Sequence, residues 1–368
     1  MGNKKILIVS RAFYPMVAPR SYRATELAKE FARQGHDVTV LIHKKEFDYT
    51  DFQVKYNLTI RDFVNGQWYD IPKTSNPLVN FLKGVLKYFF IFPDIQLVRL
   101  IKKALLCESN YDLLISIAIP YPVHWGVAKA IQKNPKLVKT WVADCGDPFM
   151  GNKEQKIKFP FYFHLVENWF CTKPDYISIP IEEAKDAYPE KCRHKIRVIP
   201  QGFDFSFSLD GITKNNESRP TFAYAGSLSK GIRDPQGFLK FLTAVEFNFK
   251  FICYTKDTAL LKPYTNDLGS KLEIRDYIPR EELLLELKSM DFLVNFENRD
   301  KVQSPSKLID YALVGRPILS IAHNNSDWNT TLEFLKGNYA NAFKLPNLEK
   351  YDVKNVSKQF IDLVLSER

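Results

Sequence analysis

The chain has 368 residues, two to three times the ~150 residues of a typical domain, so two α/β-sized domains are expected and a single small binding module is excluded. Its composition is 45% hydrophobic and 26% charged, which suits packed cores and excludes a disordered chain. Lysine and arginine outnumber the acidic residues by 52 to 42, so we expect one face to meet an anion: nucleic acid, a nucleotide or an anionic membrane surface.

The cysteines and the apolar runs indicate a cytoplasmic protein. Five scattered cysteines form no CxxC pair and no metal-like cluster with the six histidines, which is typical of buried thiols in a reducing compartment. The apolar run at residues 6–9 is too short for the core of a signal peptide. The stretch at 88–106 is interrupted by proline and charged residues, so we predict no membrane span.

The first half of the chain alternates short apolar runs with helical periodicity. A strand-length run at 4–10, a helix with apolar positions from Ala24 to Ala32 and a second run at 38–42 predict one βαβ unit of a parallel sheet. The first turn contains no glycine, so it fails the GxGxxG pattern of a dinucleotide site. Further elements complete one Rossmann-like, doubly wound sheet: strands at 111–119, 140–144, 176–180 and 196–200, and a helix at 123–132.

A polar, turn-rich stretch at 201–220 holds the predicted domain boundary. A second alternation follows it, with strands at 221–226, 249–255, 271–278, 292–296 and 317–322 and helices after Pro235 and at 280–289 and 306–314. The predicted fold class is therefore α/β, with two Rossmann-like doubly wound parallel-sheet domains at 1–203 and 204–350. The helical spacing in 351–368 predicts a C-terminal helix that packs back across a domain surface.

Residues 303–319 carry groups suited to an anion. Ser304 is a good N-cap, so Ser306 and Lys307 fall in the first helical turn, where free N–H groups and the helix dipole favour a phosphate. Asp310 follows on the same helix face and can accept hydrogen bonds from sugar hydroxyls. An ordinary capped helix with a solvated Lys/Asp pair explains the pattern equally well.

Residues 223–235 form a second candidate. A predicted strand ends at Gly226, whose missing Cβ lets backbone approach a ligand, and Lys230 and Arg233 follow before the next helix. Lysine and arginine together suit a diphosphate. The alternative is an exposed glycine turn with incidental basic residues, but two basic βα turns in one domain support each other.

Taken together, segments throughout the chain resemble family 4 glycosyltransferases of the GT-B fold, in the subgroup that builds bacterial surface polysaccharides. The matching segments are 13–41, 92–94, 116–129, 142–149, 198–204, 226–235 and 306–319. The resemblance implies that the two domains face each other across a cleft, the first binding the acceptor and the second a nucleotide-sugar donor, and that the C-terminal helix returns to the N-terminal domain.

The resemblance also implies a donor site in the second domain. The residues expected around the diphosphate, base and ribose are Gly226, Ser227, Lys230, Arg233, Ile278, Ser306, Lys307, Leu308 and Asp310. Val302 replaces the first glutamate of the family pattern, so Gln303 or Ser304 is expected to recognise the donor sugar. The resemblance implies no cofactor and no metal ion.

Candidates in the first domain lie after its predicted strands. His124 matches a family histidine near the reacting sugar, and Asp144 and Asp147 follow a strand at its carboxyl end, where open α/β sheets bind ligands. We predict catalytic roles for His124 and Asp147, and place Asp144, Arg20 and Arg23 on the acceptor or phosphate side. Each has a structural alternative: a core histidine, a turn or capping aspartate, or a solvated helix start.

Residues 78–106 mix aromatic and aliphatic side chains with five basic ones, as does an amphipathic helix that rests on an anionic leaflet. Ordinary core helices with aromatic stripes look similar. No recognised nucleic-acid motif is present, so we predict no nucleic-acid partner.

The function implied by the resemblance is that of a retaining glycosyltransferase. It would move a sugar from a nucleoside diphosphate sugar to a hydroxyl of a lipid-linked glycan in capsule, O-antigen or exopolysaccharide biosynthesis, at the inner face of the cell membrane. One alternative is a nucleotide-sugar 2-epimerase of the same fold, in which Asp144, Asp147 or His124 would transfer protons. The other is a non-catalytic peripheral membrane scaffold with a vestigial nucleotide site.

Overall fold

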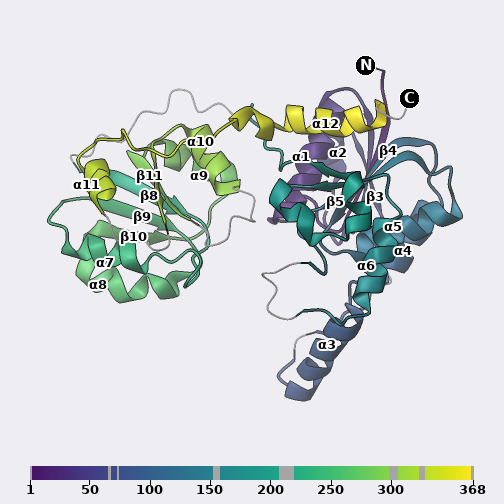
Figure 1. Cartoon of the computed structure of the whole chain (residues 1–368), viewed down its shortest axis with the longest axis horizontal. Coiled ribbons are helices and arrows are strands. Elements are labelled where there is room, and N and C mark those ends of the chain that lie inside the picture. The colour runs from purple at the N-terminus through teal and green to yellow at the C-terminus, as the bar shows by residue number, and fades with distance from the viewer. Residues whose placement is uncertain are drawn as a thin grey trace. The chain divides into compact units, whose positions relative to one another are not determined.

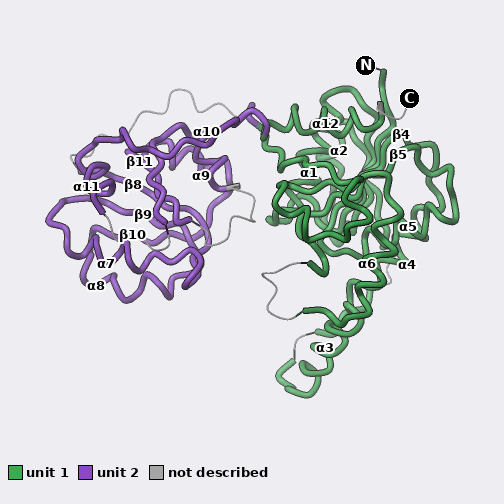
Figure 2. Tube along the Cα trace, in the orientation of Figure 1, with its two compact units in different colours: residues 1–204, 351–368 green, residues 205–350 purple. Residues whose placement is uncertain are grey.

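The chain divides into two compact units, shown in Figure 2: unit 1 comprises residues 1–204 and 351–368, and unit 2 comprises residues 205–350. This computed structural model describes residues 2–64, 68–72, 74–151, 158–206, 219–297, 306–322 and 328–365. Each unit is built on a parallel sheet of its own, with helices on both faces (Figure 1).

Unit 1 contains a seven-stranded parallel sheet in the order β3-β2-β1-β4-β5-β6-β7. Its strands are β1 (Lys5–Ser10), β2 (Asp37–Ile42), β3 (Thr59–Asp62), β4 (Tyr111–Ala118), β5 (Val138–Cys145), β6 (Tyr176–Ile179) and β7 (Ile196–Val198). In the central register, Ile8 of β1 lies opposite Val40 of β2 and Ile115 of β4. All strands predicted for the first half are present, and β3 is an additional edge strand.

The helices of unit 1 cover both faces of this sheet. They are α1 (Pro19–Arg33), α2 (Thr50–Tyr56), α3 (Pro77–Phe90), α4 (Gln96–Leu105), α5 (Pro122–Lys133), α6 (Phe163–Cys171) and α12 (Val353–Leu365). Successive side chains of β1 point to opposite faces: Leu7 and Val9 join the core under α4 and α5, and Ile6 and Ile8 join the core under α1 and α12. This alternation is the doubly wound arrangement expected from the sequence.

The C-terminal helix α12 belongs to unit 1, as predicted. Val356, Phe360 and Ile361 are buried in the core that contains Ile6 and Ile8. Gln34 Nε2, at the end of α1, donates a hydrogen bond to Ser357 Oγ at 2.8 Å. The last segment of the chain therefore completes the core of the domain that the first segment begins.

Residues 78–106 form two helices rather than the single predicted one. A left-handed residue, Ile91 with φ +55°, ends α3 before α4 begins. The apolar face of α4 is in the core through Leu97, Ile101 and Leu105, whereas α3 has no buried residue. Across the described residues, no helix combines the length and the apolar character that crossing a membrane requires.

Unit 2 contains a five-stranded parallel sheet in the order β10-β9-β8-β11-β12. Its strands are β8 (Thr221–Ala225), β9 (Lys250–Tyr254), β10 (Leu272–Arg275), β11 (Phe292–Phe296) and β12 (Ile318–Ile321). Its helices are α7 (Gln236–Ala244), α8 (Thr265–Leu268), α9 (Arg280–Lys288), α10 (Ser306–Val314) and α11 (Asn329–Leu335). Phe222 and Tyr224 of β8 enter one core, and Ala223 and Ala225 enter the other, so this sheet is also packed on both faces.

Candidate functional site

The candidate site lies at the carboxyl edge of the unit 2 sheet, where the strand order reverses between β8 and β11. Gly226 follows β8 and donates its N–H to the carbonyl of Tyr254 at 3.0 Å. Its φ of +147° suits glycine, and a Cβ here would lie 3.3 Å from Tyr224 Oη and 3.6 Å from Cδ of Lys307. The absent side chain therefore leaves room for Lys307, on the first turn of α10, beside the end of β8.

Lys307 places its ammonium over an aromatic surface. The Nζ atom lies 4.2 Å from the ring centroid of Tyr224 and 6.0 Å from that of Tyr311. It is buried and has no hydrogen-bond partner among the described residues. Burial, together with the positive charge of Arg233, lowers the pKa of Lys307 to about 7. A buried cation without a bonded partner is costly, and a bound anion would remove that cost.

Arg233 brings a second cation to the same place. The backbone groups of Ser229 and Arg233 exchange two hydrogen bonds of 3.0 Å, which close the turn after β8. Arg233 Nε is buried and, like Lys307 Nζ, has no partner in the part of the chain that the structure describes. Two such cations at the carboxyl edge of a parallel sheet make an arrangement that fits a phosphate or a diphosphate.

The other residues predicted around the diphosphate differ in their placement. The carbonyl of Ser227 accepts a hydrogen bond from Tyr224 Oη at 2.7 Å, so it fixes the turn beside Gly226. Lys230 is exposed at the tip of the same turn. Ser304 lies outside the described residues, and Ser306 begins α10, with only its backbone described.

The remaining donor-site candidates are Ile278, predicted for the base, Leu308, predicted for the phosphates, and Asp310, predicted for the ribose. Ile278 and Leu308 both pack against one core cluster of unit 2. Asp310 accepts from Arg280 through Nη2 at 2.6 Å and Nε at 2.9 Å. Burial raises the pKa of Asp310, and the charge of Arg280 opposes that rise. The carboxylate has further lone pairs for ribose hydroxyls, and Arg280 holds it in place.

Two contributors to this site were not predicted from the sequence: Tyr224, whose ring supports Lys307, and Arg280, which pairs with Asp310. Tyr224 lies in the TFAYAG strand that ends at the predicted glycine turn. Because side chains alternate between the two faces of a strand, its position two residues before Gly226 could have indicated that it lies near the site. Arg280 begins a helix in another segment, and nothing in the local pattern linked it to Asp310.

In unit 1 the structure brings Arg20, Arg23 and Asp144 together, but in a buried network. Asp144 accepts from Arg23 through Nη2 at 2.9 Å and Nε at 3.1 Å, and from Ser178 Oγ at 2.7 Å. Arg20 Nη1 lies 3.3 Å from Asp144. Arg23 also donates to the carbonyls of residues 199 and 200. Arg23 and Asp144 are buried and bonded to each other, and their predicted place on the acceptor or phosphate side stays a prediction.

His124 is placed in the core rather than at a surface. Its ring is fully buried, stacks on Phe170 at 5.1 Å and lies 2.8 Å from Ser116 Oγ through Nδ1 and 3.5 Å from Cys145 Sγ through Nε2. Burial lowers its pKa to about 3, so the imidazole is neutral. This is the core placement of the structural alternative, and the catalytic role predicted for His124 stays a prediction.

Asp147, also predicted as catalytic, is exposed after β5. Its carbonyl accepts from Tyr121 Oη at 2.7 Å, which fixes the loop while leaving the carboxylate at the surface. Its predicted role in catalysis stays a prediction.

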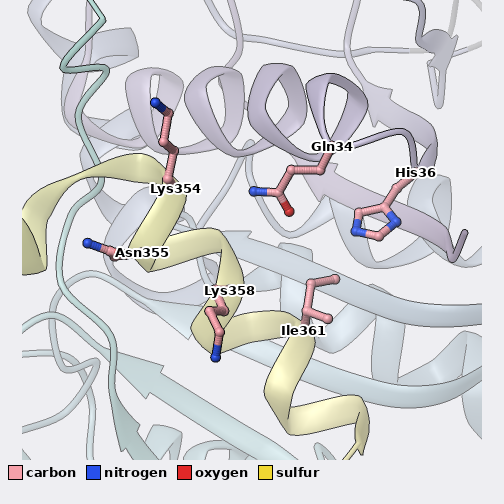
Figure 3. Close-up of a pocket in the computed structure, with 6 residues that line it drawn as sticks. All are labelled: Gln34, His36, Lys354, Asn355, Lys358 and Ile361. Atoms are coloured by element: carbon pink, nitrogen blue, oxygen red, sulfur yellow. The ribbon is translucent and has the colours of Figure 1, made fainter. Parts of the chain in front are cut away.

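Unit 1 also contains a pocket that none of these residues lines (Figure 3). It opens between the end of α1 and α12 and is lined by Gln34, His36, Lys354, Asn355, Lys358 and Ile361. His36 immediately precedes β2, so the pocket is at the amino edge of the sheet, opposite the edge where open α/β sheets bind ligands. Burial lowers the pKa of His36, and Lys4 adds to that effect.

The cysteines partly follow the prediction of buried thiols. Cys145, Cys171, Cys192 and Cys253 are buried, whereas Cys107 is exposed at the end of α4. Among the described residues, no three His, Cys, Asp or Glu side chains are grouped so as to hold a metal ion.

Comparisons with known proteins place this fold among glycosyltransferases. HepE of Anabaena in complex with UDP and glucose matches with a TM-score of 0.61 at 12% identity, over 99% of this chain and 100% of that chain. The lipopolysaccharide outer core galactosyltransferase WaaB matches with a TM-score of 0.60 at 13% identity, over 99% of this chain and 100% of that chain. Sucrose-phosphate synthase of Thermosynechococcus elongatus matches with a TM-score of 0.64 at 10% identity, over 99% of each chain. At these identities the likeness establishes the GT-B fold alone.

The sequence itself carries the family assignment. No curated protein sequence matches the chain significantly. The sequence model described as Glycosyltransferase Family 4 matches residues 21–207, more than half of the 368 residues. The chain therefore belongs to glycosyltransferase family 4.

Proposed function

We propose that this protein is a retaining glycosyltransferase that moves a sugar from a nucleoside diphosphate sugar to a hydroxyl of a lipid-linked glycan in surface polysaccharide biosynthesis. It would work as a peripheral protein at the inner face of the cell membrane, which residues 78–106 would contact. Among proteins of the same fold, HepE has been crystallised with UDP-glucose and WaaB is a galactosyltransferase of the lipopolysaccharide outer core.

One observation carries the donor assignment: among the described residues, Lys307 Nζ and Arg233 Nε are buried without hydrogen-bond partners at the edge where the strand order reverses between β8 and β11. A diphosphate would pair with both. In a front-face displacement the bond from the sugar to the diphosphate breaks as the acceptor hydroxyl attacks from the same side. Lys307 and Arg233 would stabilise the negative charge that develops on the departing diphosphate. A phosphate oxygen of the donor would take the proton of the hydroxyl, so no side-chain nucleophile is needed.

The alternatives fit the described residues less well. A 2-epimerase needs side chains that exchange protons with the sugar, but His124 is fully buried with a lowered pKa and Asp144 is bonded to Arg23, so only Asp147 of the three candidates is exposed. A scaffold with a vestigial nucleotide site has no use for two buried cationic nitrogens that lack hydrogen-bond partners among the described residues, and turnover of a nucleotide sugar would contradict it.

Binding of nucleotides tests the donor site. We expect calorimetry against UDP, GDP, CMP and their sugar conjugates to find one nucleoside diphosphate that binds, and Arg233→Met to weaken that binding about tenfold because a charge-assisted pair is lost. Lys240→Met, on the exposed surface of α7, is the matched control and should bind as the wild type does. Equal affinity in the two variants would remove Arg233 from the donor site.

Hydrolysis of the donor sugar in the absence of an acceptor tests two properties of the reaction: whether the anomeric configuration is retained and whether a metal ion is needed. When water replaces the acceptor, retention predicts that the first sugar released has the anomeric configuration of the donor, which NMR can observe before mutarotation. We expect EDTA to leave the rate unchanged, since the cations assigned to the diphosphate are side chains. Inverted product would contradict the retaining mechanism, and a rate abolished by EDTA would show that a metal is needed.

A further inference from the structure

Helix α3 is attached to unit 1 by its polar face and leaves its apolar face exposed. Asn80 Nδ2 donates to the carbonyl of Thr74 at 2.7 Å, and Lys83 Nζ lies 3.3 Å from Asp70 and also donates to the carbonyl of Ile71. Asn80 and Lys83 both contact the segment that precedes the helix. A helix that packs on a globular core does the opposite, burying its apolar stripe and exposing its polar one.

The exposed face of α3 is a continuous apolar stripe. Leu78, Phe81, Leu82, Val85 and Phe89 recur at the three- and four-residue spacing that puts side chains on one side of a helix. Leu78 is 75% exposed and Phe81 70%. Figure 1 shows α3 as an arm that extends beyond the sheet of unit 1, with α6 at its base.

The start of α6 continues this surface. Tyr162 Oη donates to the carbonyl of Phe89, the last but one residue of α3, and so ties the two helices together. Phe161, just before α6, is 83% exposed, and Leu165, in the first turn of α6, is 70% exposed. These two residues lie outside the segment 78–106 to which the sequence assigned membrane contact. Within that segment, α4 is excluded because its apolar residues are in the core.

The charge around this surface indicates which kind of partner it can bind. Helix α3 carries Lys83, which pairs with Asp70, and Lys87, and α4 carries Arg99, Lys102 and Lys103. The only acidic residue within 77–105 is Asp94, which pairs with Arg11 at 2.6 Å. A second copy of this chain would bring like charges together across a symmetric contact, whereas an anionic bilayer accepts both the apolar stripe and the basic flanks.

We propose that the apolar face of α3 together with Phe161 and Leu165 is one surface that inserts into the interface of an anionic membrane. α3 lies in the membrane plane with Leu78, Phe81 and Leu82 among the acyl chains. Phe161 and Leu165 fix the tilt of the domain relative to the membrane. A domain held through one helix can still rotate about that helix, whereas contact through two helices prevents this rotation. This inference deepens the proposed function, whose acceptor is lipid-linked, and rests on it for the biological role.

Co-sedimentation of the full chain with vesicles tests the surface. We expect binding to phosphatidylcholine vesicles that contain about 30% phosphatidylglycerol, and much weaker binding to phosphatidylcholine alone. The double variant Phe81→Asn/Leu82→Asn should lower the partition coefficient by at least about tenfold, and Phe161→Asn/Leu165→Asn by about three- to tenfold. Val54→Asn removes a 79% exposed valine from α2 and is the matched control, expected to bind as the wild type does.

Several results would overturn the proposal. They are a wild type that stays in the supernatant with anionic vesicles, a Val54→Asn loss as large as that of the α3 variant, and an α6 variant that binds undiminished. A dimer of the wild type that Phe81→Asn/Leu82→Asn converts to a monomer would assign the face to a second copy instead. Nucleotide binding by the same variants depends on the donor site alone. Loss of nucleotide binding would therefore count against the proposed function, whereas loss of vesicle binding alone concerns only the membrane surface.

Discussion

Asp144→Asn is expected to lower the free energy of unfolding by about 3–5 kcal/mol, because it leaves the guanidinium of Arg23 buried without its charged partner. Asp144 Oδ1 and Oδ2 each accept a hydrogen bond from Arg23, and both side chains are almost fully buried. Arg23 also faces the ring of Phe360 at 5.1 Å, so the pair joins α1, β5 and α12. Urea unfolding followed by circular dichroism measures the change.

Two further variants separate the buried charge from general damage. Asp362→Asn removes a carboxylate whose partner, Lys358, is exposed on α12, and it should cost no more than about 0.5 kcal/mol. Adding Arg23→Met to Asp144→Asn removes the orphaned charge and should recover part of the loss. If Asp144→Asn is no more destabilising than Asp362→Asn, the network is not what holds these elements together.

The same carboxylate predicts sensitivity to acid. Burial alone would raise the pKa of Asp144, but Arg23, Arg20 and the hydrogen bond from Ser178 outweigh it and the pKa is lowered. A carboxylate with a lowered pKa in the folded state stabilises the fold above its ordinary range, and that contribution is lost as the pH falls through the lowered value. Asp144→Asn should therefore flatten the acid side of the stability profile.

The strands were predictable because their apolar runs are continuous. Strands β1 and β4 lie inside their sheet and bury nearly every side chain, so their sequences needed no tertiary information. Edge strand β3 buries only Ile60 fully, and its TIRD sequence resembles a loop. β10 was predicted to extend to residue 278 but ends at Arg275, where the chain turns toward α9. Strand length at the edges depends on pairing, which a local pattern does not contain.

Residues of the candidate site were predictable where the chemistry is local. Gly226, Arg233 and Lys307 each lie in a turn whose residue types indicate an anion. Partners from distant segments, such as Tyr224 beneath Lys307, were not predictable, because they depend on which strand ends beside which helix. The placement of His124 in the core was not predictable for a related reason: a histidine beside a strand end looks the same in sequence whether its ring faces a ligand or the core.

Affinity for the donor is expected to fall about tenfold between pH 6 and pH 8, because Lys307 must be protonated to pair with a diphosphate. Its pKa of about 7 in the free protein means that below neutral pH it is already charged, whereas above neutral pH binding must first take up a proton. A bound diphosphate raises that pKa, so the loss follows the titration of the free protein. Its described neighbours Tyr224, Tyr311 and Cys253 keep their protons in this range, since burial raises the pKa of each.

Calorimetry with a nucleotide sugar in two buffers of different ionisation enthalpy measures this uptake directly. We expect nearly one proton per site at about pH 8 for the wild type and none for Lys307→Met. The methionine variant should also bind about 10- to 100-fold more weakly at neutral pH, since a charge-assisted pair with the diphosphate is lost. Lys307→Arg stays charged across the range and should bind with no pH dependence. A wild type whose affinity is the same at both pH values would show that Lys307 does not meet the diphosphate.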